Sequence, residues 1–402
     1  MIVYQTKRII IVLIVALVAV TVVCGLLLVS CSNRSNLSPD APNAKLEQLV
    51  SGQVGSGDSA GNCVLAVAKG DGSYFWVGAA GIANQKDQVP MTKDTPIYIA
   101  SILKLYTATV IMQLYEKGAL SLDDPISRYL PEGLIKGIHV YKGKDYSQEI
   151  TIRQLLSHTS GIADYYTKKP KGGKSIFETL LEEPERIWTD NETIEWARDK
   201  LKPNFPPGTD ASYSDTNFDL LGKIIESITG QPLHIVYEDF IFRPLGLTHT
   251  WVIERSTPQI PIPTSPADVF YKDRNITNIR SNSAYWPYIV STSEEMVLFL
   301  KALNEGKIIS KDTLQLMHNW HKLEFPIQYG YGTMYFKLPP LMSKMSGLTP
   351  LWGHSGSTGS FLYYSEDLDL YMAGSIDKVG SDIKPFMLMR GVMKLFAPGS
   401  TK

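Results

Sequence analysis

The stretch IYIASILKLYTATVIMQL, from Ile97 to Leu114, contains a single charged residue, Lys104. Its apolar character and the glycine that follows it, Gly118, predict a buried helix from about Tyr98 to Glu116. Residues three positions apart on a helix lie on the same face, so Ser101 is expected to lie beside Lys104. The sequence therefore predicts a hydroxyl and an amine in contact inside an apolar helix.

Two interpretations of Lys104 are open. Among apolar neighbours a lysine is costly to charge, so its pKa falls and its amine, held partly neutral, can take the proton of Ser101. The backbone N–H groups at the helix start would favour the negative charge that develops there. Alternatively, Lys104 extends its charged end into solvent from a half-buried helix. The pattern S-x-x-K alone favours this second interpretation, because such short matches arise by chance.

Two further stretches favour the first interpretation. Tyr213-Ser214-Asp215 lies in FPPGTDASYSDTNFDLLGKIIESITG, and His354-Ser355-Gly356 lies in LWGHSGSTGSFLYY. Together with SILK, these stretches resemble the three motifs of the serine β-lactamase and penicillin-binding-protein superfamily in order and spacing. The branch they resemble holds class C β-lactamases, D-Ala-D-Ala peptidases with a His-Thr-Gly third motif, and related esterases. The segments LSLDDPISRYLP, ITIRQLLSHTSGI, FRPLGLTHT and IVSTSEEMVLFLKAL extend the resemblance over residues 62–396.

The resemblance implies a role for each matching position. Ser101 would be the nucleophile, Lys104 its general base, and Tyr213 a second proton shuttle. A tyrosine with a pKa near 10 is a poor base at neutral pH, so Tyr213 needs a nearby cation such as Lys104. The backbone N–H groups of Ser101 and Ser357 would form the oxyanion hole. The residues implied to bind substrate are Asp215, His354, Ser355 and Gly356.

Two positions depart from the pattern of that branch. Asp215 stands where class C enzymes have asparagine, and an ionised carboxylate suits an amine or N–H better than a carbonyl. His354 replaces the lysine of the third motif, so its contact with a substrate carboxylate should be weaker and pH-dependent. Both departures, and the missing E-x-x-L-N signature of class A deacylation, argue against a dedicated β-lactamase.

The order of the segments predicts an α+β fold. CVLAVAKGDGSYFWVGAAG predicts a hairpin that turns at Gly70–Gly72, and helical periodicity follows in ITIRQLLSH, TIEWARDKL and FDLLGKIIESITG. YGYGTMYF, SFLYYSEDL and LYMAGSID predict strands before a closing helix at Ile383–Phe396. We expect an antiparallel sheet flanked by helices, with an α/β part at about 62–120 and 285–396 and a mainly helical part inserted at about 121–284.

The amino terminus predicts export. Lys7 and Arg8 precede an apolar run from Ile9 to Val29, and LVSC at its end resembles the lipobox of bacterial lipoproteins. The resemblance implies that residues 1–30 are a signal peptide and that Cys31 carries lipid. The alternative is an uncleaved signal anchor, because about 20 apolar residues can span a bilayer. Residues 31–61 are expected to form a flexible tether, with a short helix around 44–50, and either anchor places the rest of the chain outside the cytoplasmic membrane.

Other candidate sites carry less weight. GDSAG formally matches a nucleophile elbow at Ser59, but a Gly/Ser-rich linker precedes it where a strand is needed. His158 and Ser160 are too near in sequence to face each other usefully. His318 and His321 have no third ligand, so we predict no metal site and no cofactor. Cys63 stands alone once Cys24 is removed with the signal peptide and Cys31 carries lipid, and we expect it to be a core residue.

The composition is that of a globular protein, with 402 residues, 44% hydrophobic, 20% charged, and a formal net charge of −1. Nothing in this balance suggests nucleic-acid binding. We therefore predict a membrane-tethered serine hydrolase that forms an acyl-enzyme on Ser101, most readily with D-Ala-D-Ala-type peptides. The enzyme alternatives are a class C-like β-lactamase or a carboxylesterase. The alternative of another class is a penicillin-binding or scaffold domain with negligible turnover. The oligomeric state stays open.

Overall fold

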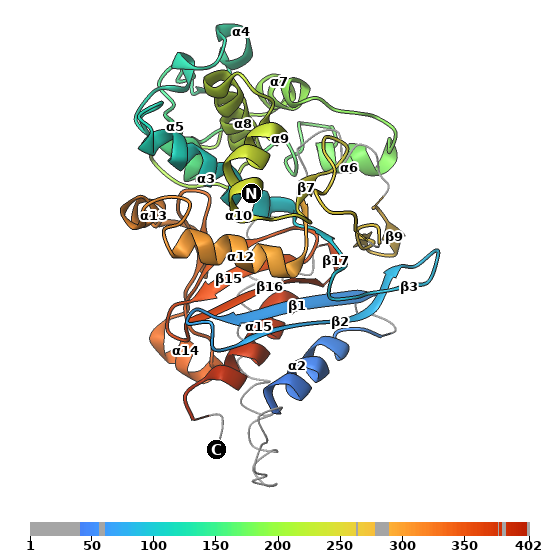
Figure 1. Cartoon of the computed structure of the whole chain (residues 1–402). Helices are drawn as coiled ribbons and strands as arrows, with labels where there is room; N and C mark the ends of the chain where they lie inside the picture. The colour runs from blue at the N-terminus through green and yellow to red at the C-terminus, as the bar shows by residue number, and fades with distance from the viewer. Residues whose placement is uncertain are drawn as a thin grey trace. The chain divides into compact units, whose positions relative to one another are not determined.

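A nine-stranded antiparallel sheet, built from both ends of the chain, forms the core of the fold (Figure 1). The computed structural model describes residues 41–55, 61–262, 264–277, 289–376, 378–379 and 383–399. The predicted signal segment 1–30, Cys31 and Ser59 lie outside these residues. The part from Pro42 to Ala397 forms one compact unit.

The central strands come from opposite ends of the sequence. Ala66 lies opposite Val77 in the predicted hairpin and opposite Ala373 on its other side. Gly72, with a φ of 76°, makes the hairpin turn in a conformation that a side chain would strain. In spatial order the strands are β11 (His321–Glu324), β12 (Ile327–Tyr329), β13 (Met334–Phe336), β14 (Leu351–Ser355), β15 (Ser360–Ser365), β16 (Leu370–Ile376), β1 (Asn62–Lys69), β2 (Phe75–Asn84) and β3 (Val89–Pro90).

Helices cover both faces of the sheet. On β1, Val64 and Ala66 belong to one apolar cluster, whereas Cys63 and Leu65 belong to the other, as the alternation of a strand requires. Helix α12 (Ser293–Asn304) covers the first face, and α15 (Ile383–Phe396) and α2 (Ala41–Ser51) cover the second (Figure 1). Cys63 is fully buried, as expected of a core residue.

Helix α2 lies inside the segment expected to be a tether. Its side chains Leu46 and Val50 are 0% and 1% exposed in the cluster with α15. The residues from Pro42 to Ser51 therefore belong to the folded unit rather than to a flexible linker. No helix among the described residues is both long and apolar enough to cross a bilayer.

The helical part lies on the α12 side of the sheet (Figure 1). Its helices are α3 (Leu103–Glu116), α4 (Glu132–Ile135), α5 (Ile152–Leu156), α6 (Ile176–Glu182), α7 (Asp190–Lys200), α8 (Asp215–Thr229), α9 (Leu233–Tyr237) and α10 (Arg243–Leu245). Shorter helical turns are η1 (Ala100–Ile102), η2 (Ile126–Arg128) and η3 (Glu238–Phe242), and the remaining helices are α13 (Lys311–Met317) and α14 (Pro340–Ser346). The short strands are β4 (Ile97–Tyr98), β5 (Val140–Tyr141), β6 (Lys144–Asp145), β7 (Trp251–Val252), β8 (Phe270–Tyr271), β9 (Arg274–Asn275), β10 (Ile289–Ser291) and β17 (Lys378–Val379).

Helix α3 is the central helix of this part. Its side chains from Leu103 to Leu114 are buried, and Tyr106 stacks on Phe299 of α12 with ring centroids 3.8 Å apart. The prediction that this helix begins near Tyr98 is wrong. Strand β4 pairs there with β10, and Ala100, with a φ of 47°, interrupts the chain before the helix begins at Leu103. The predicted α+β class is otherwise confirmed, with the sheet between two helical layers.

Candidate active site

Ser101 lies in the turn that joins strand β4 to helix α3. The preceding Ala100 is 3% exposed and has a φ of 47°, a left-handed conformation that strains a residue with a side chain. Ser101 is the second residue of η1 and is half-buried. This turn holds the Ser101 hydroxyl at the start of the helix, where the backbone N–H groups point outward.

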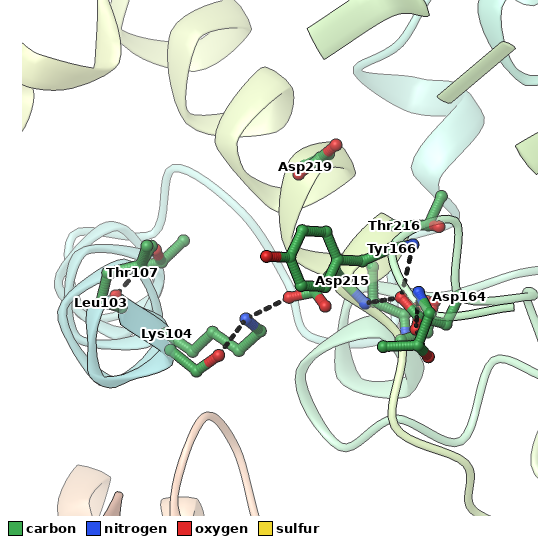
Figure 2. A network of polar contacts seen from close by, with 12 residues as sticks. Leu103, Lys104, Thr107, Asp164, Tyr166, Asp215, Thr216 and Asp219 are labelled. Atoms are coloured by element: carbon green, nitrogen blue, oxygen red, sulfur yellow. Dashed lines mark hydrogen bonds and ion pairs between the residues drawn. The ribbon is translucent and has the colours of Figure 1, made fainter. Parts of the chain in front are cut away.

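Lys104 lies between two partners. Its side chain is 2% exposed, and its Nζ donates to Ser101 Oγ at 3.3 Å and to Asp215 Oδ1 at 2.5 Å (Figure 2). The alternative that Lys104 reaches solvent is therefore wrong. Burial lowers the pKa of Lys104, but the charge of Asp215 and its hydrogen bond outweigh burial, so the pKa lies above 10.5. This direction is opposite to the lowered pKa that the sequence predicts for Lys104, because the sequence does not reveal the contact with Asp215.

Tyr213 comes directly before helix α8 and faces the same two side chains. Lys104 Nζ lies 5.2 Å from the centroid of the Tyr213 ring, and the Tyr213 hydroxyl is hydrogen-bonded to Ser101. Burial, and next the charge of Asp215, raise the pKa of Tyr213 well above 10, although the bond to Ser101 opposes this. The structure therefore brings together the three predicted catalytic residues, with Tyr213 as a neutral phenol.

His158 contacts the segment that carries Tyr213 and holds it in place. The Ser214 N–H lies 3.3 Å from its Nδ1 and donates to it, and its ring lies 4.4 Å from the Tyr213 ring. Its carbonyl accepts from the Ser212 N–H. Ser160 instead donates to Asn217 at 2.7 Å, so His158 and Ser160 form no catalytic pair.

The third motif brings a strand end against the Ser101 turn. A Cβ on Gly356 would lie 2.4 Å from the carbonyl oxygen of Ile99, so only glycine fits at this contact. Ser357, the next residue, is exposed and lines the same cavity as Ser101. Ser355 is hydrogen-bonded to the Tyr363 hydroxyl at 2.8 Å. The predicted oxyanion pair, Ser101 and Ser357, thus shares one cavity.

His354 does not face that cavity. It is 0% exposed, its Nε2 lies 2.9 Å from the Tyr329 hydroxyl, and its Nδ1 lies 2.8 Å from the Ser355 carbonyl oxygen. Burial, and next the charge of Lys104, lower the pKa of His354 to about 3. The prediction that His354 contacts a substrate carboxylate in a pH-dependent way is therefore wrong for this structure, because the ring is neutral and bonded inside the protein.

The loop from Asp164 to Thr167 forms a wall of the site that sequence reasoning missed. Asp164 is 4% exposed, and its carboxylate accepts from the backbone N–H groups of Asp215, at 3.1 Å, and of Tyr166 and Thr167 (Figure 2). Burial, and next the charge of Asp215, raise the pKa of Asp164 to about 6. The only signal in the sequence was that an aspartate can form a side-chain turn with the backbone N–H two residues later, here that of Tyr166. Such a turn does not indicate that Asp164 belongs to the active site.

These segments enclose a cavity of about 230 Å³. Of the residues predicted to bind substrate, Asp215 lines this cavity. Gly356 does not line it and instead packs against Ile99 and Ser360. The lining residues are Ala100, Ser101, Leu103, Lys104, Asp164, Tyr165, Tyr166, Thr167, Tyr213, Asp215 and Ser357.

No set of three His, Cys, Asp or Glu side chains that suits a metal ion occurs in the part of the chain that the structure describes. His318 caps α13 and stacks on Trp320 with ring centroids 4.9 Å apart, whereas His321 begins strand β11. Burial lowers the pKa of His318 to about 4. The two histidines thus belong to different elements.

An antiparallel sheet with a helical insert, in which a Ser-x-x-Lys turn meets a tyrosine of the insert at one cavity, defines the β-lactamase and transpeptidase fold. The model of the Beta-lactamase family matches residues 46–383, and the chain belongs to this family.

Individual relatives agree with this assignment. Over 194 residues the chain is 29% identical to the D-alanyl-D-alanine-carboxypeptidase/endopeptidase AmpH of Escherichia coli, covering 48% of this chain and 46% of the relative. It is 27% identical to the esterase EstB of Burkholderia gladioli, covering 50% of this chain and 49% of the relative. The chain thus spans about half the length of these curated relatives. A D-stereospecific amidohydrolase from a Streptomyces species superposes with a TM-score of 0.69 at 28% identity, over 89% of this chain and 98% of that chain.

Proposed function

We propose that the protein is a serine hydrolase that works through an acyl-enzyme on Ser101. The observation that carries the proposal is the meeting of Ser101, Lys104 and Tyr213 at one cavity, with Lys104 Nζ 3.3 Å from Ser101 Oγ. A serine bonded to an amine and a phenol in a buried site is the arrangement of an activated nucleophile. Membership of the Beta-lactamase family supports the same chemistry.

Each residue then has a defined task. Ser101 Oγ attacks the acyl carbon, and the N–H groups of Ser101 and Ser357 bind the oxygen that becomes negative, each donor contributing roughly 3 kcal/mol in the transition state. Tyr213 passes a proton to the leaving group and later takes one from the water that attacks the acyl-enzyme. The release of the acid product restores Ser101.

We propose amides and peptides of D-amino acids as the substrate class. The names of the relatives support this choice, since AmpH is called a D-alanyl-D-alanine carboxypeptidase and the Streptomyces protein a D-stereospecific amidohydrolase. Asp215 adds a reason of this chain's own, because its carboxylate lines the cavity and a carboxylate suits the N–H groups of an amide or amine as hydrogen-bond donors.

Esters are the second candidate substrates, and the position of His354 favours them. Lys104 is the only cation among the described residues that line the cavity, and Asp215 already neutralises it. With His354 buried and neutral, a free substrate carboxylate has no unpaired cation to bind there. This arrangement favours esters and capped amides over peptides with a free terminal carboxylate, and the relative EstB carries the name of an esterase.

We further propose that the hydrolase is tethered outside the cytoplasmic membrane through the lipid-modified Cys31. The support is the sequence alone, namely the apolar run from Ile9 to Val29 and the LVSC motif. Helix α2 begins ten residues after Cys31, which sets a short tether between the lipid and the folded unit.

A comparison of three substrates tests the proposed reaction. The purified protein is offered a D-alanine amide, a p-nitrophenyl ester and a D-Ala-D-Ala peptide, and is labelled with a fluorescent penicillin. We expect turnover of the amide or ester, and we expect Ser101→Ala to lower it by at least about 1,000-fold while the thermal midpoint stays unchanged. Retained activity in Ser101→Ala would refute the assignment of the nucleophile. Stable labelling without turnover would support the penicillin-binding alternative, and neither signal would support a scaffold.

A further inference from the structure

Two helices on the second face of the sheet expose apolar side chains to solvent. On α14, Leu341 is 71% exposed and Met345 is 50% exposed, and their four-residue spacing puts both on one side of the helix. On α15, Ile383 and Met387 have the same spacing and are also exposed. Large apolar side chains that gather in this way on a surface mark a contact with a partner or a membrane.

These two helices form one continuous surface, which adjoins helix α2. Arg390 of α15 donates from Nε to the carbonyl oxygen of Ser346, the last residue of α14, at 2.6 Å. Elsewhere on α15, a Cβ on Gly391 would lie 2.8 Å from Leu49 of α2. Figure 1 shows the three helices on the side of the sheet opposite the helical part. We call the exposed surface of residues 340–346 and 383–396 the α14–α15 face.

The charge of the α14–α15 face is positive, although the whole chain has a net charge of −1. The two helices together carry four basic residues and no acidic residue, whereas α2 carries one of each sign. The four basic residues are Lys344, Lys384, Arg390 and Lys394. By helical spacing, Arg390 and Lys394 continue the exposed stripe of Ile383 and Met387. Apolar side chains flanked by Lys and Arg are the pattern with which helices lie on an anionic lipid surface.

The length of the proposed tether favours a membrane over other occupants of this face. Helix α2 begins ten residues after Cys31, and ten residues span at most about 36 Å even when fully extended. A folded unit of roughly 350 residues is about 50 Å across. A lipid on Cys31 would therefore keep α2, and with it α14 and α15, nearer the bilayer than the opposite side of the folded unit.

We propose that the α14–α15 face lies on the surface of an anionic membrane. Leu341, Met345 and Met387 enter the headgroup region, and the basic side chains contact lipid phosphates. This inference rests on the proposed tether and goes beyond it, because it assigns the side of the folded unit that meets lipid. A few such contacts bind weakly by themselves, but the tether raises the local concentration of the face at the membrane. The cavity at Ser101, whose walls come from the helical part, is then kept away from lipid.

A dye attached near the middle of the face tests this contact in the full chain. Met345→Cys is labelled with nitrobenzoxadiazole, whose emission moves to shorter wavelength in an apolar environment, whereas Cys63 is buried and stays unlabelled. The wild type, labelled in the same way, measures any dye on Cys24 or Cys31. The protein is reconstituted into vesicles of phosphatidylcholine alone, or of equal parts phosphatidylcholine and phosphatidylglycerol. We expect a shift to shorter wavelength only on the anionic vesicles, reversed by about 1 M salt, at which the Debye length is about 3 Å.

Matched variants identify the residues that make the contact. The same dye on Leu316→Cys of α13, an exposed apolar position in the helical layer on the other face, should show no shift. Lys344→Glu combined with Lys394→Glu should abolish the shift at position 345, since both lysines are exposed and their reversal repels lipid phosphate. Lys311→Glu, an exposed lysine of α13, should leave the shift unchanged. Equal thermal midpoints show that the variants fold, and the salt dependence of the singly labelled protein decides if the double variant does not.

The outcomes separate this proposal from those it rests on. A chain that floats with the vesicles but shows no shift, or shifts equally on both kinds of vesicle, would overturn the α14–α15 contact alone. A shift that appears without vesicles and grows with protein concentration would show that a second copy covers the face, and would overturn the membrane contact too. A chain that does not float with the vesicles would refute the anchor, and with it this inference. Hydrolysis of a p-nitrophenyl ester by the same samples reports on the hydrolase independently.

Discussion

His354 shows what one buried side chain does to stability. Its ring is held between the Tyr329 hydroxyl and the Ser355 carbonyl, and its pKa is about 3 because burial, and next the charge of Lys104, oppose protonation. In the unfolded chain a histidine takes a proton near pH 6.5. The unfolded state therefore binds more protons below that pH, and the stability that neutral His354 provides is lost as the pH falls from 6.5 towards 3.

His354→Gln tests this effect. From pH 7.5 to pH 5 the wild type is expected to lose about 2 kcal/mol of unfolding free energy through His354 alone. Glutamine can bond to the same two partners and does not titrate, so the variant should lose correspondingly less. Urea unfolding at the two pH values measures the difference. An equal acid loss in both proteins would show that His354 is not the titrating group.

The chemical partners of Ser101 were predictable, but their charge states were not. The i, i+3 spacing of Ser101 and Lys104 and the three motifs were enough to bring Tyr213 to the same site. Whether Lys104 is neutral depends on Asp215, a residue 111 positions away, and no spacing rule reports that contact. Asp164 was missed for the same reason, because its side chain enters the site through a loop turn.

At the scale of elements, the contact between strand β14 and the η1 turn determines the shape of the site. Gly356 follows the last residue of β14 and lies against Ile99 and Ser360, where a Cβ would come within 2.4 Å and 2.1 Å of their oxygens. This close approach keeps Ser357 and Ser101 on one cavity. A side chain at Gly356 must separate the two elements.

Gly356→Ala is expected to reduce activity more than stability. Overpacking of this size typically costs about 1–3 kcal/mol, and the shift of Ser357 away from Ser101 should lower kcat/KM for a p-nitrophenyl ester by at least about 10-fold through the lost oxyanion donor. Gly133→Ala is the control, because nothing lies within 4 Å of a Cβ there. Equal kcat/KM in the two variants would contradict the proposed role of the β14 contact.

Element types were predicted well wherever a local pattern decides them. The hairpin at Gly70–Gly72 and the closing helix Ile383–Phe396 follow from turn residues and periodicity, and both are confirmed. The start of α3 was predicted too early because Ile97 and Tyr98 pair with β10, nearly two hundred residues later in the chain. Such a distant pairing overrides local propensity, and it leaves no trace in the helix sequence itself.

At the scale of the whole chain, the proposed tether and the folded unit are separable. The catalytic residues, the sheet and both helical layers all lie between Pro42 and Ala397. Removal of residues 1–30 is therefore expected to move the protein from the membrane fraction to the soluble fraction and to leave kcat/KM for the ester unchanged. Fractionation of cells that express either form measures this. A full-length chain in the soluble fraction would contradict the tether, and Cys31→Ala would show whether lipid, rather than the apolar run, provides the anchor.

The pairing of β1 with β16 also sets an order of events during synthesis. Cys63 lies opposite Ile376, so strand β1 can pair with β16 only after more than three hundred further residues have been synthesised. Until then the hairpin of β1 and β2 is a two-stranded ribbon, which is marginally stable by itself. Such non-local pairing folds slowly and exposes apolar surface to aggregation. The nine-stranded sheet, and with it the cavity at Ser101, is therefore expected to be complete only after the residues of β16 have been synthesised.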